Sequence, residues 1–144
     1  FIMISKQLSV FIENRRGRLG EVLEVLKKNK VNILSLSLAD TTEFGLLRLI
    51  VNDPALAAEN LVSEGFSAML TDVLVVKINH KSGSLQGLLE ILSRDEINVE
   101  YMYGLSIEGE KATVVLKSSD LAESDRILNQ NGYETLSIEE TVRS

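Results

Sequence analysis

Two short turns carry the residue types and spacing in this chain that best suit the binding of a small anion. They read Asn14-Arg15-Arg16-Gly17-Arg18-Leu19 and His80-Lys81-Ser82-Gly83-Ser84-Leu85. Each places a glycine just before a predicted helix. The backbone amides at a helix N-terminus lack partners within the helix and bind carboxylate or phosphate groups. Glycine also lets a ligand approach the backbone closely.

The first turn gathers three arginines, at positions 15, 16 and 18. Positive side chains at a helix N-terminus oppose the helix dipole. Three of them together indicate an anionic ligand or a facing acidic surface. The alternative is a tight turn whose arginines are simply solvated, and the residues alone leave both interpretations open.

Residues for catalysis are scarce. His80 is the only histidine and there is no cysteine, which excludes disulfides and thiolate metal sites. The chain has no nucleophile elbow, phosphate-binding loop, dinucleotide fingerprint or zinc-protease motif. A single histidine also narrows the options for general acid–base chemistry, and it is more simply an ordinary loop residue. We therefore expect no enzymatic activity, no cofactor and no metal.

Charge and hydropathy exclude two further classes of protein. The net charge is −6, and an acidic chain without a strong basic face is poorly suited to nucleic acid. The predicted strands 46–51 and 112–116 also lack the aromatic residues on which an RNA-recognition motif stacks bases. No apolar run is long enough to cross a membrane and no secretory signal is present, so we expect a cytoplasmic protein.

The chain contains an internal repeat. Residues 8–33 align without a gap with residues 74–99 at a constant offset of 66. The aligned pairs include the two turn glycines, Gly17 and Gly83. A repeat of this length fits a small duplicated domain. We expect two domains, at residues 1–71 and 72–144, separated only by Thr71-Asp72.

Hydrophobic periodicity predicts the same element order in both halves. In the first half we expect strands near 8–12, 31–39, 46–51 and 66–70, with helices from 19 and from 53 to about 64. In the second half we expect strands at 73–78, 97–107, 112–116 and 133–138, with helices from 85 and from about 118 to near Gly132. Asp53, and Ser119 at its repeat position, are the expected helix caps.

The predicted fold class is α+β. The order β-α-β-β-α-β, read twice, is that of the ferredoxin-like split βαβ unit. Each copy should form an antiparallel four-stranded sheet with two helices packed on one face. This fold hosts many unrelated functions, so the function has to be argued from particular residues.

The second strand differs between the copies. Ile33, Ser35 and Ser37 share one face, and their counterparts are Val99, Tyr101 and Tyr103. Two tyrosines on one strand face suit a pocket wall or a dimer interface, or they pack against a neighbouring element. Asn32 and Asn98 lie where a helix gives way to a strand, and asparagine is a common turn former.

At these residues the sequence resembles the ACT domain. The resemblance rests on Asn14-x-x-Gly17-x-Leu19 followed by Val31-Asn32-Ile33, and on His80-x-x-Gly83-x-Leu85 followed by Ile97-Asn98-Val99. It covers nearly the whole chain as two copies. It implies small regulatory modules of amino-acid metabolism with the predicted element order, paired side by side with an amino acid bound at the interface.

The resemblance also implies which residues bind the amino acid. In that family the backbone of the first turn holds the charged groups of the ligand, and the second strand of the partner closes the site. The implied residues in the first copy are Asn14, Arg16, Gly17, Arg18, Leu19, Asn32, Ile33 and Ser35. Those in the second copy are His80, Gly83, Leu85, Asn98, Val99 and Tyr101. His80 departs from the usual Asp or Asn, so we expect binding first at residues 14–19.

These implications leave three hypotheses of different classes. The first is a free-standing amino-acid sensor that binds a small amino acid, has no catalytic activity and forms a homodimer. The second is a regulatory subunit of an amino-acid biosynthetic enzyme, because the first turn is similar to that of acetolactate synthase regulatory subunits. The third is a small enzyme on the same fold, which the scarcity of nucleophiles and bases argues against.

Overall fold

The computed structural model describes residues 2–138 and contains two successive β-α-β-β-α-β units. The chain begins with β1 (Ser5–Glu13), α1 (Arg18–Lys28), β2 (Ile33–Asp40), β3 (Phe44–Val51), α2 (Pro54–Ser63) and β4 (Ser67–Asn79). It continues with α3 (Ser84–Arg94), β5 (Val99–Glu108), β6 (Lys111–Ser118), α4 (Leu121–Gln130) and β7 (Glu134–Leu136). The predicted α+β fold class is confirmed.

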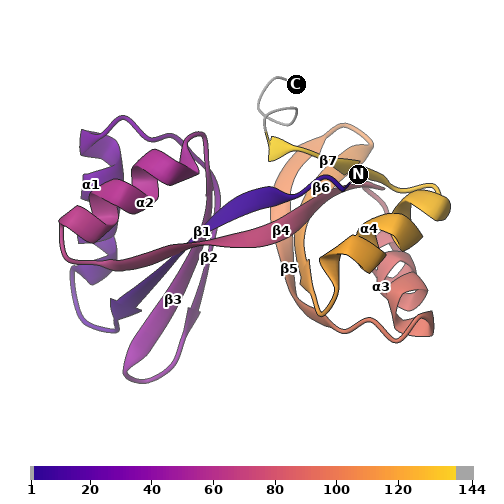
Figure 1. Cartoon of the computed structure of the whole chain (residues 1–144), viewed down its shortest axis with the longest axis horizontal. Coiled ribbons are helices and arrows are strands. Elements are labelled where there is room, and N and C mark those ends of the chain that lie inside the picture. The colour runs from indigo at the N-terminus through magenta and orange to yellow at the C-terminus, as the bar shows by residue number, and fades with distance from the viewer. Residues whose placement is uncertain (1, 139–144) are drawn as a thin grey trace. The chain divides into compact units, whose positions relative to one another are not determined.

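The chain folds as two compact units. Residues 6–71 form one unit, here called the first module, and the chain from Asp72 onward, together with the residues up to Ser5, forms the second module. The strand order is β2-β3-β1-β4 in the first module and β7-β4-β6-β5 in the second. In each module two helices cover one face of the sheet (Figure 1). The second strand of each repeat, β2 or β5, is thus an edge strand.

One strand replaces two that the sequence predicted separately. The predicted strands 66–70 and 73–78 are parts of β4, which runs from Ser67 to Asn79 without interruption. No glycine or proline occurs between these two residues, so nothing in the local sequence turns the chain out of the extended conformation. The last strand of the first repeat therefore leads directly into the first strand of the second.

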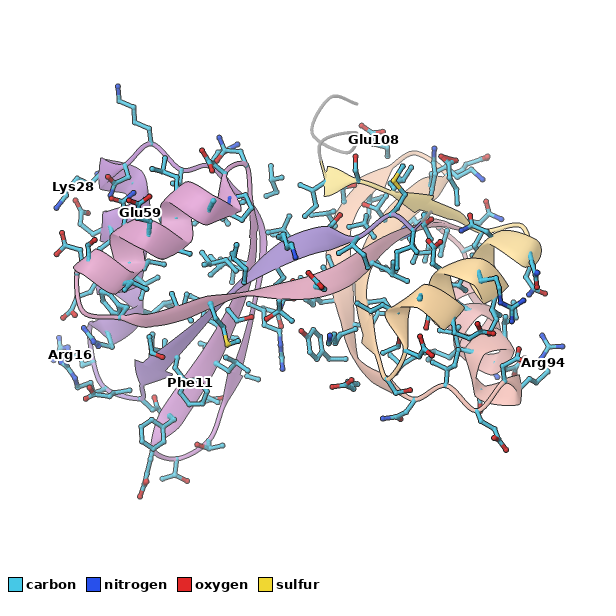
Figure 2. The ribbon with its side chains drawn as sticks, in the orientation of Figure 1. Phe11, Arg16, Lys28, Glu59, Arg94 and Glu108 are labelled. Atoms are coloured by element: carbon cyan, nitrogen blue, oxygen red, sulfur yellow. The ribbon has the colours of Figure 1, made fainter. Side chains whose placement is uncertain are left out.

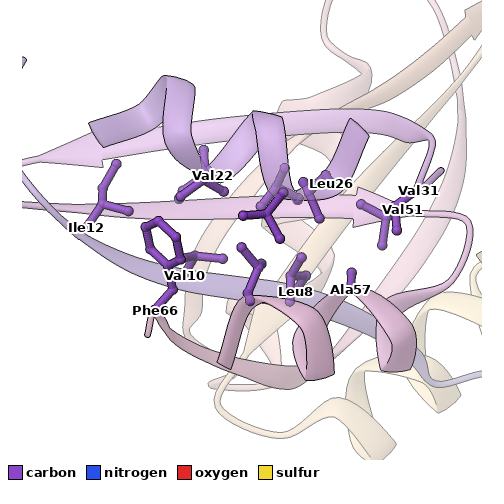
Figure 3. Close-up of a cluster of buried hydrophobic side chains, with 13 residues drawn as sticks. Leu8, Val10, Ile12, Val22, Leu26, Val31, Val51, Ala57 and Phe66 are labelled. Carbon is purple, nitrogen blue, oxygen red and sulfur yellow. The ribbon is translucent and has the colours of Figure 1, made fainter. Parts of the chain in front are cut away.

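Each module has its own hydrophobic core beneath its helices. In the first module Val22 and Leu26 of α1 face Leu8 and Val10 of β1 (Figure 3). In the second module Leu88 and Leu92 of α3 pack with Leu74, Val76 and their neighbours. These helical residues lie three or four positions apart, which is the spacing that produces one apolar face. The helix of each repeat is thus held against its sheet directly behind the turn that precedes it.

Aspartate side chains begin the second helix of each repeat. Asp53 Oδ1 accepts a hydrogen bond from the Leu56 amide at 3.2 Å, and Asp120 Oδ1 accepts one from the Glu123 amide at 3.0 Å. The prediction that Ser119 caps this helix, α4, is therefore wrong. The Ser119 hydroxyl instead accepts a hydrogen bond from the Asn98 amide at 3.1 Å. The repeat offset grows from 66 to 67 before α4, because β5 carries one additional residue in its second half.

These caps give a first stability prediction. Replacing Asp120 by alanine leaves the Glu123 amide without its acceptor, so the free energy of unfolding should fall by about 1 kcal/mol, within a range of about 0.5–2. Replacing Ser119 by alanine removes a different bond and does not uncap α4. Urea denaturation of both variants measures the effect. An unchanged stability for Asp120→Ala would contradict the cap assignment.

Candidate functional site

The two turns singled out in the sequence have nearly the same backbone geometry. Gly17 precedes α1 and Gly83 precedes α3, and both have φ at 85°, in the left-handed region that favours glycine. Among the described residues no side chain caps either helix. The first amide of each helix donates to a carbonyl oxygen of the preceding turn, Arg18 N to Arg15 O at 3.3 Å and Ser84 N to Lys81 O at 3.2 Å. The amides of the next two residues of each helix are therefore the ones placed to bind an anion.

In the first module the turn is tied to the β2–β3 hairpin. Asn14 Nδ2 donates to the carbonyl oxygens of Thr41 at 3.0 Å and Thr42 at 3.3 Å. The Asn14 backbone amide donates to the Glu43 carbonyl at 2.9 Å. The side-chain amide of Asn14 thus already has two protein acceptors, which assigns it a structural role.

Two of the three arginines of this turn have acidic partners. Arg15 Nε lies 3.1 Å from Glu13 Oε2. Arg18 Nη1 lies 2.6 Å from Glu21 Oε2, and its guanidinium stacks over the ring of Phe66 at 4.1 Å. Arg16 is exposed and extends away from the ribbon (Figure 2). The positive charge of the turn is therefore largely balanced within the first module.

Predicted residues of the first module line two separate hollows. Arg18 lines a hollow of about 300 Å³ beside Phe66. Asn32 and Ile33 line a separate one of about 470 Å³ near the end of α1. Leu19 packs against the core, and Ser35 lies on the edge strand β2.

The second module holds a larger cavity, of about 820 Å³, at the corresponding turn. Three segments line it: the β4–α3 turn with the start of α3, residues 102–107 of β5, and residues 112–114 of β6. The cavity lies where the N-terminus of α3 approaches the edge of the sheet. This arrangement places the second and third amides of α3, at Leu85 and Gln86, near a space large enough for a small metabolite.

Several predicted residues of the second module lie at or near this cavity. His80 and Leu85 line it, and Gly83 lines an adjoining hollow of about 480 Å³. Asn98, Val99 and Tyr101 are not among the described residues that line either space. Tyr101 stacks on Tyr103 with a centroid distance of 6.4 Å, and Tyr103 does line the cavity.

One residue that lines the cavity, Gly104, was not among those predicted from the sequence. Gly104 of β5 pairs with Val114 of β6, which in turn lies beside Val76 of β4. In the first module the corresponding cross-strand neighbours are Leu38 on β2, Leu47 on β3 and Val10 on β1. Gly104 is therefore the structural counterpart of Leu38.

The exchange of leucine for glycine gives the two modules different surroundings at this position. In the first module the Leu38 side chain lies over Gly45, so that a methyl group added at Gly45 would meet Leu38 Cδ1 at 3.2 Å and Ile12 Cγ1 at 3.3 Å. In the second module the counterparts of Gly45 and Ile12 are Ala112 and Ile78, and both line the cavity. Leu38 thus lies over Gly45 in the first module while remaining 43% exposed, whereas Gly104 places no side chain at the equivalent position beside the cavity.

Strand β5 also carries an irregularity next to this glycine. The pairing register of β5 shifts between Val99 and Tyr101 and again between Gly104 and Ser106, whereas β2 shows only the first of these shifts. Bulges redirect side chains and are common beside binding sites. The gapless alignment of the repeats ends at residue 99, which is why this feature escaped sequence comparison.

Lysine side chains lie around the turn of the second module. The adjoining hollow is lined by Lys77, Lys81 and Lys111, and Lys81 lines the larger cavity as well. Lys111 Nζ donates to Asn79 Oδ1 at 2.5 Å. No acidic side chain is among the described residues that line the larger cavity. The lysines and the positive end of the α3 dipole act together in favour of a carboxylate.

Among residues 2–138, no three histidine, cysteine, aspartate or glutamate side chains gather in a way that suits a metal ion. Within the same residues, no helix has both the length and the apolar character needed to span a bilayer.

Comparison with known proteins gives one family and several structural relatives. Residues 3–140 match the family described as an ACT domain pair. A crystal structure of a protein from Bacteroides thetaiotaomicron is 36% identical with a TM-score of 0.88, over 94% of this chain and 93% of that one. Regulatory subunits of aspartate kinase from Thermus thermophilus and Thermus flavus are 15% identical, with TM-scores of 0.63 and 0.62. Each match covers 90% of this chain and 93% of the subunit, and at that identity shows the fold alone. The comparison with curated proteins gave no match.

Proposed function

The chain belongs to the ACT domain pair family, and we propose that it binds a free amino acid in the cavity of its second module. The observation that carries this proposal is the coincidence of two features. The uncapped N-terminus of α3 opens beside a cavity of about 820 Å³, and the lysines around the turn supply positive charge. An amino acid matches this arrangement because its carboxylate needs hydrogen-bond donors while its side chain needs space.

In this proposal the backbone of the turn from His80 to Leu85 receives the carboxylate. Binding at the amides of a helix N-terminus requires no particular side chain, which agrees with the different residues that the two turns carry. The side chain of the ligand extends from the turn toward Gly104 on β5. The protein acts as a regulator: the ligand shifts the population of a conformation that a partner recognises, which requires different affinities for two conformations.

A binding screen tests the proposal directly. Thermal denaturation is followed with each of the twenty amino acids and a few related metabolites. A ligand at 100-fold its dissociation constant adds about 2.7 kcal/mol of stability. At about 2–4 °C per kcal/mol this is a shift of several degrees for a chain of this size. A flat screen would contradict amino-acid binding and favour the alternative of a regulatory subunit that acts through protein contact with a biosynthetic enzyme.

A matched pair of glycine substitutions locates the site. Gly17 and Gly83 have the same φ of 85°, and a methyl group at either position meets no atom within 4 Å. Replacing either by alanine should therefore cost a similar amount of backbone strain, about 1–2 kcal/mol. Only Gly83→Ala should also weaken binding of the amino acid found in the screen, as measured by isothermal titration calorimetry. Weaker binding in Gly17→Ala alone would place the site in the first module.

A further inference from the structure

We propose that Gly104 is the residue that sets ligand specificity, and that the ligand is an amino acid with a large apolar side chain. This inference rests on the proposed function. It concerns the part of the cavity away from the turn, where the side chain of a bound amino acid would lie. Two features support it: the apolar residues that line this part of the cavity, and the open space in front of Gly104.

The wall away from the turn is apolar and firmly held. Ile78, Ala112 and Val114 line the cavity and also belong to the buried core of the second module. Met102 lines the cavity and packs against the same core. Burying apolar surface of the ligand against a close-packed wall of this kind is favourable. Each additional methylene group of the ligand that is buried there therefore tightens binding.

Most polar side chains that line the cavity belong to the turn or its two ends, including Asn79, Ser82 and Ser84. The hydroxyl groups of Ser106 and Thr113 are hydrogen-bonded to each other at 2.7 Å. His80 and Lys81, the basic residues among the described ones that line the cavity, both belong to the turn. A lysine or arginine side chain on the ligand would find no carboxylate among the described residues of this wall. An aspartate or glutamate side chain would bury its charge against apolar atoms, which is costly.

Gly104 then sets the size of the side chain that fits. A methyl group added at this residue meets no atom within 4 Å, and its φ lies outside the left-handed region. The added group therefore projects into open cavity and causes no strain in the protein. In the first module Leu38 occupies the equivalent position, and its side chain lies over Gly45, the counterpart of Ala112. The inference is that the glycine makes room for the far end of a large ligand side chain.

The test measures how affinity depends on the size of the ligand side chain. Alanine, valine, leucine and phenylalanine are titrated by calorimetry into the wild-type protein, into Gly104→Ala, and into the control Gly20→Gln. Gly20 lies on α1, and its counterpart in the second repeat is Gln86. Glutamine is therefore a natural residue to place at position 20. In the wild type and the control, affinity should rise with side-chain size. In Gly104→Ala, the affinity for the largest ligand should fall by about 10- to 200-fold, while the affinity for the smaller ligands changes little.

The contradictory results separate this inference from the proposed function. If small or charged amino acids bind best, or if Gly104→Ala weakens all ligands equally, the specificity inference fails while amino-acid binding stands. If no amino acid binds the wild-type protein, the proposed function fails, and the inference falls with it. A size-dependent loss confined to Gly104→Ala supports both.

Discussion

Replacing Gly104 by leucine should abolish amino-acid binding and leave the protein folded. The substitution gives the second module the residue that the first module carries at the same register position, Leu38. The leucine side chain would occupy the open space in front of Ala112 and Val114. Since the whole leucine side chain would enter the space that the ligand needs, we expect an affinity loss of more than about 100-fold.

The stability of the same variant distinguishes a blocked site from a damaged fold. Glycine inside a strand is unfavourable, so a side chain at position 104 should leave the unliganded protein at least as stable as the wild type. The Gly20→Gln variant serves as the control for replacing a glycine at an exposed position outside the cavity. Calorimetric titration and thermal denaturation measure the two quantities. Undiminished binding in Gly104→Leu would contradict the assignment of this cavity as the ligand site.

Replacing Leu92 by alanine should destabilise the protein more strongly than the loss of a helix cap does. Leu92 lies on α3 and is fully buried in the core of the second module. Removing a side chain of this kind leaves a cavity and costs about 2–5 kcal/mol. Because α3 starts at the proposed ligand-binding turn, the same change should also loosen the site.

Two further leucines make this prediction specific. Leu26 is the counterpart of Leu92 in the repeat, is 1% exposed and belongs to the core of the first module, so Leu26→Ala should be similarly destabilising. Leu89 lies on the same helix as Leu92 but is 36% exposed, and its replacement should cost far less. Urea denaturation ranks the three variants. Equal effects for Leu92→Ala and Leu89→Ala would contradict the description of the core.

Most of the fold could be predicted from the sequence, because repeat and periodicity pointed to the same answer. The spacing of Val22 and Leu26 on α1 identified a helix with one apolar face, and the second copy repeated the pattern. The resemblance to ACT domains is confirmed by the family match over residues 3–140. The prediction of separate strands at 66–70 and 73–78 was wrong, because no glycine or proline interrupts β4 between Ser67 and Asn79.

The site was less accessible to sequence reasoning. The three arginines drew attention to the first turn, where the structure pairs Arg15 with Glu13 and Arg18 with Glu21. Gly104, the residue that we propose sets specificity, has no chemical group of its own. Its proposed role depends on its register opposite Val114 and on its equivalence to Leu38. The offset of 66 relates these two residues, but only the fold shows that Leu38 lies over Gly45 and that Gly104 lines a cavity. The additional residue in β5 also displaced the predicted cap from Asp120 to Ser119.

The most direct test of the central claim is an NMR titration of the isotopically labelled protein with leucine. The backbone amide signals are followed as the amino acid is added. If the second module holds the ligand, the changes should concentrate in the turn from His80 to Leu85 and in β5 around Gly104. Changes confined to the corresponding turn of the first module, residues 14–19, would contradict the account.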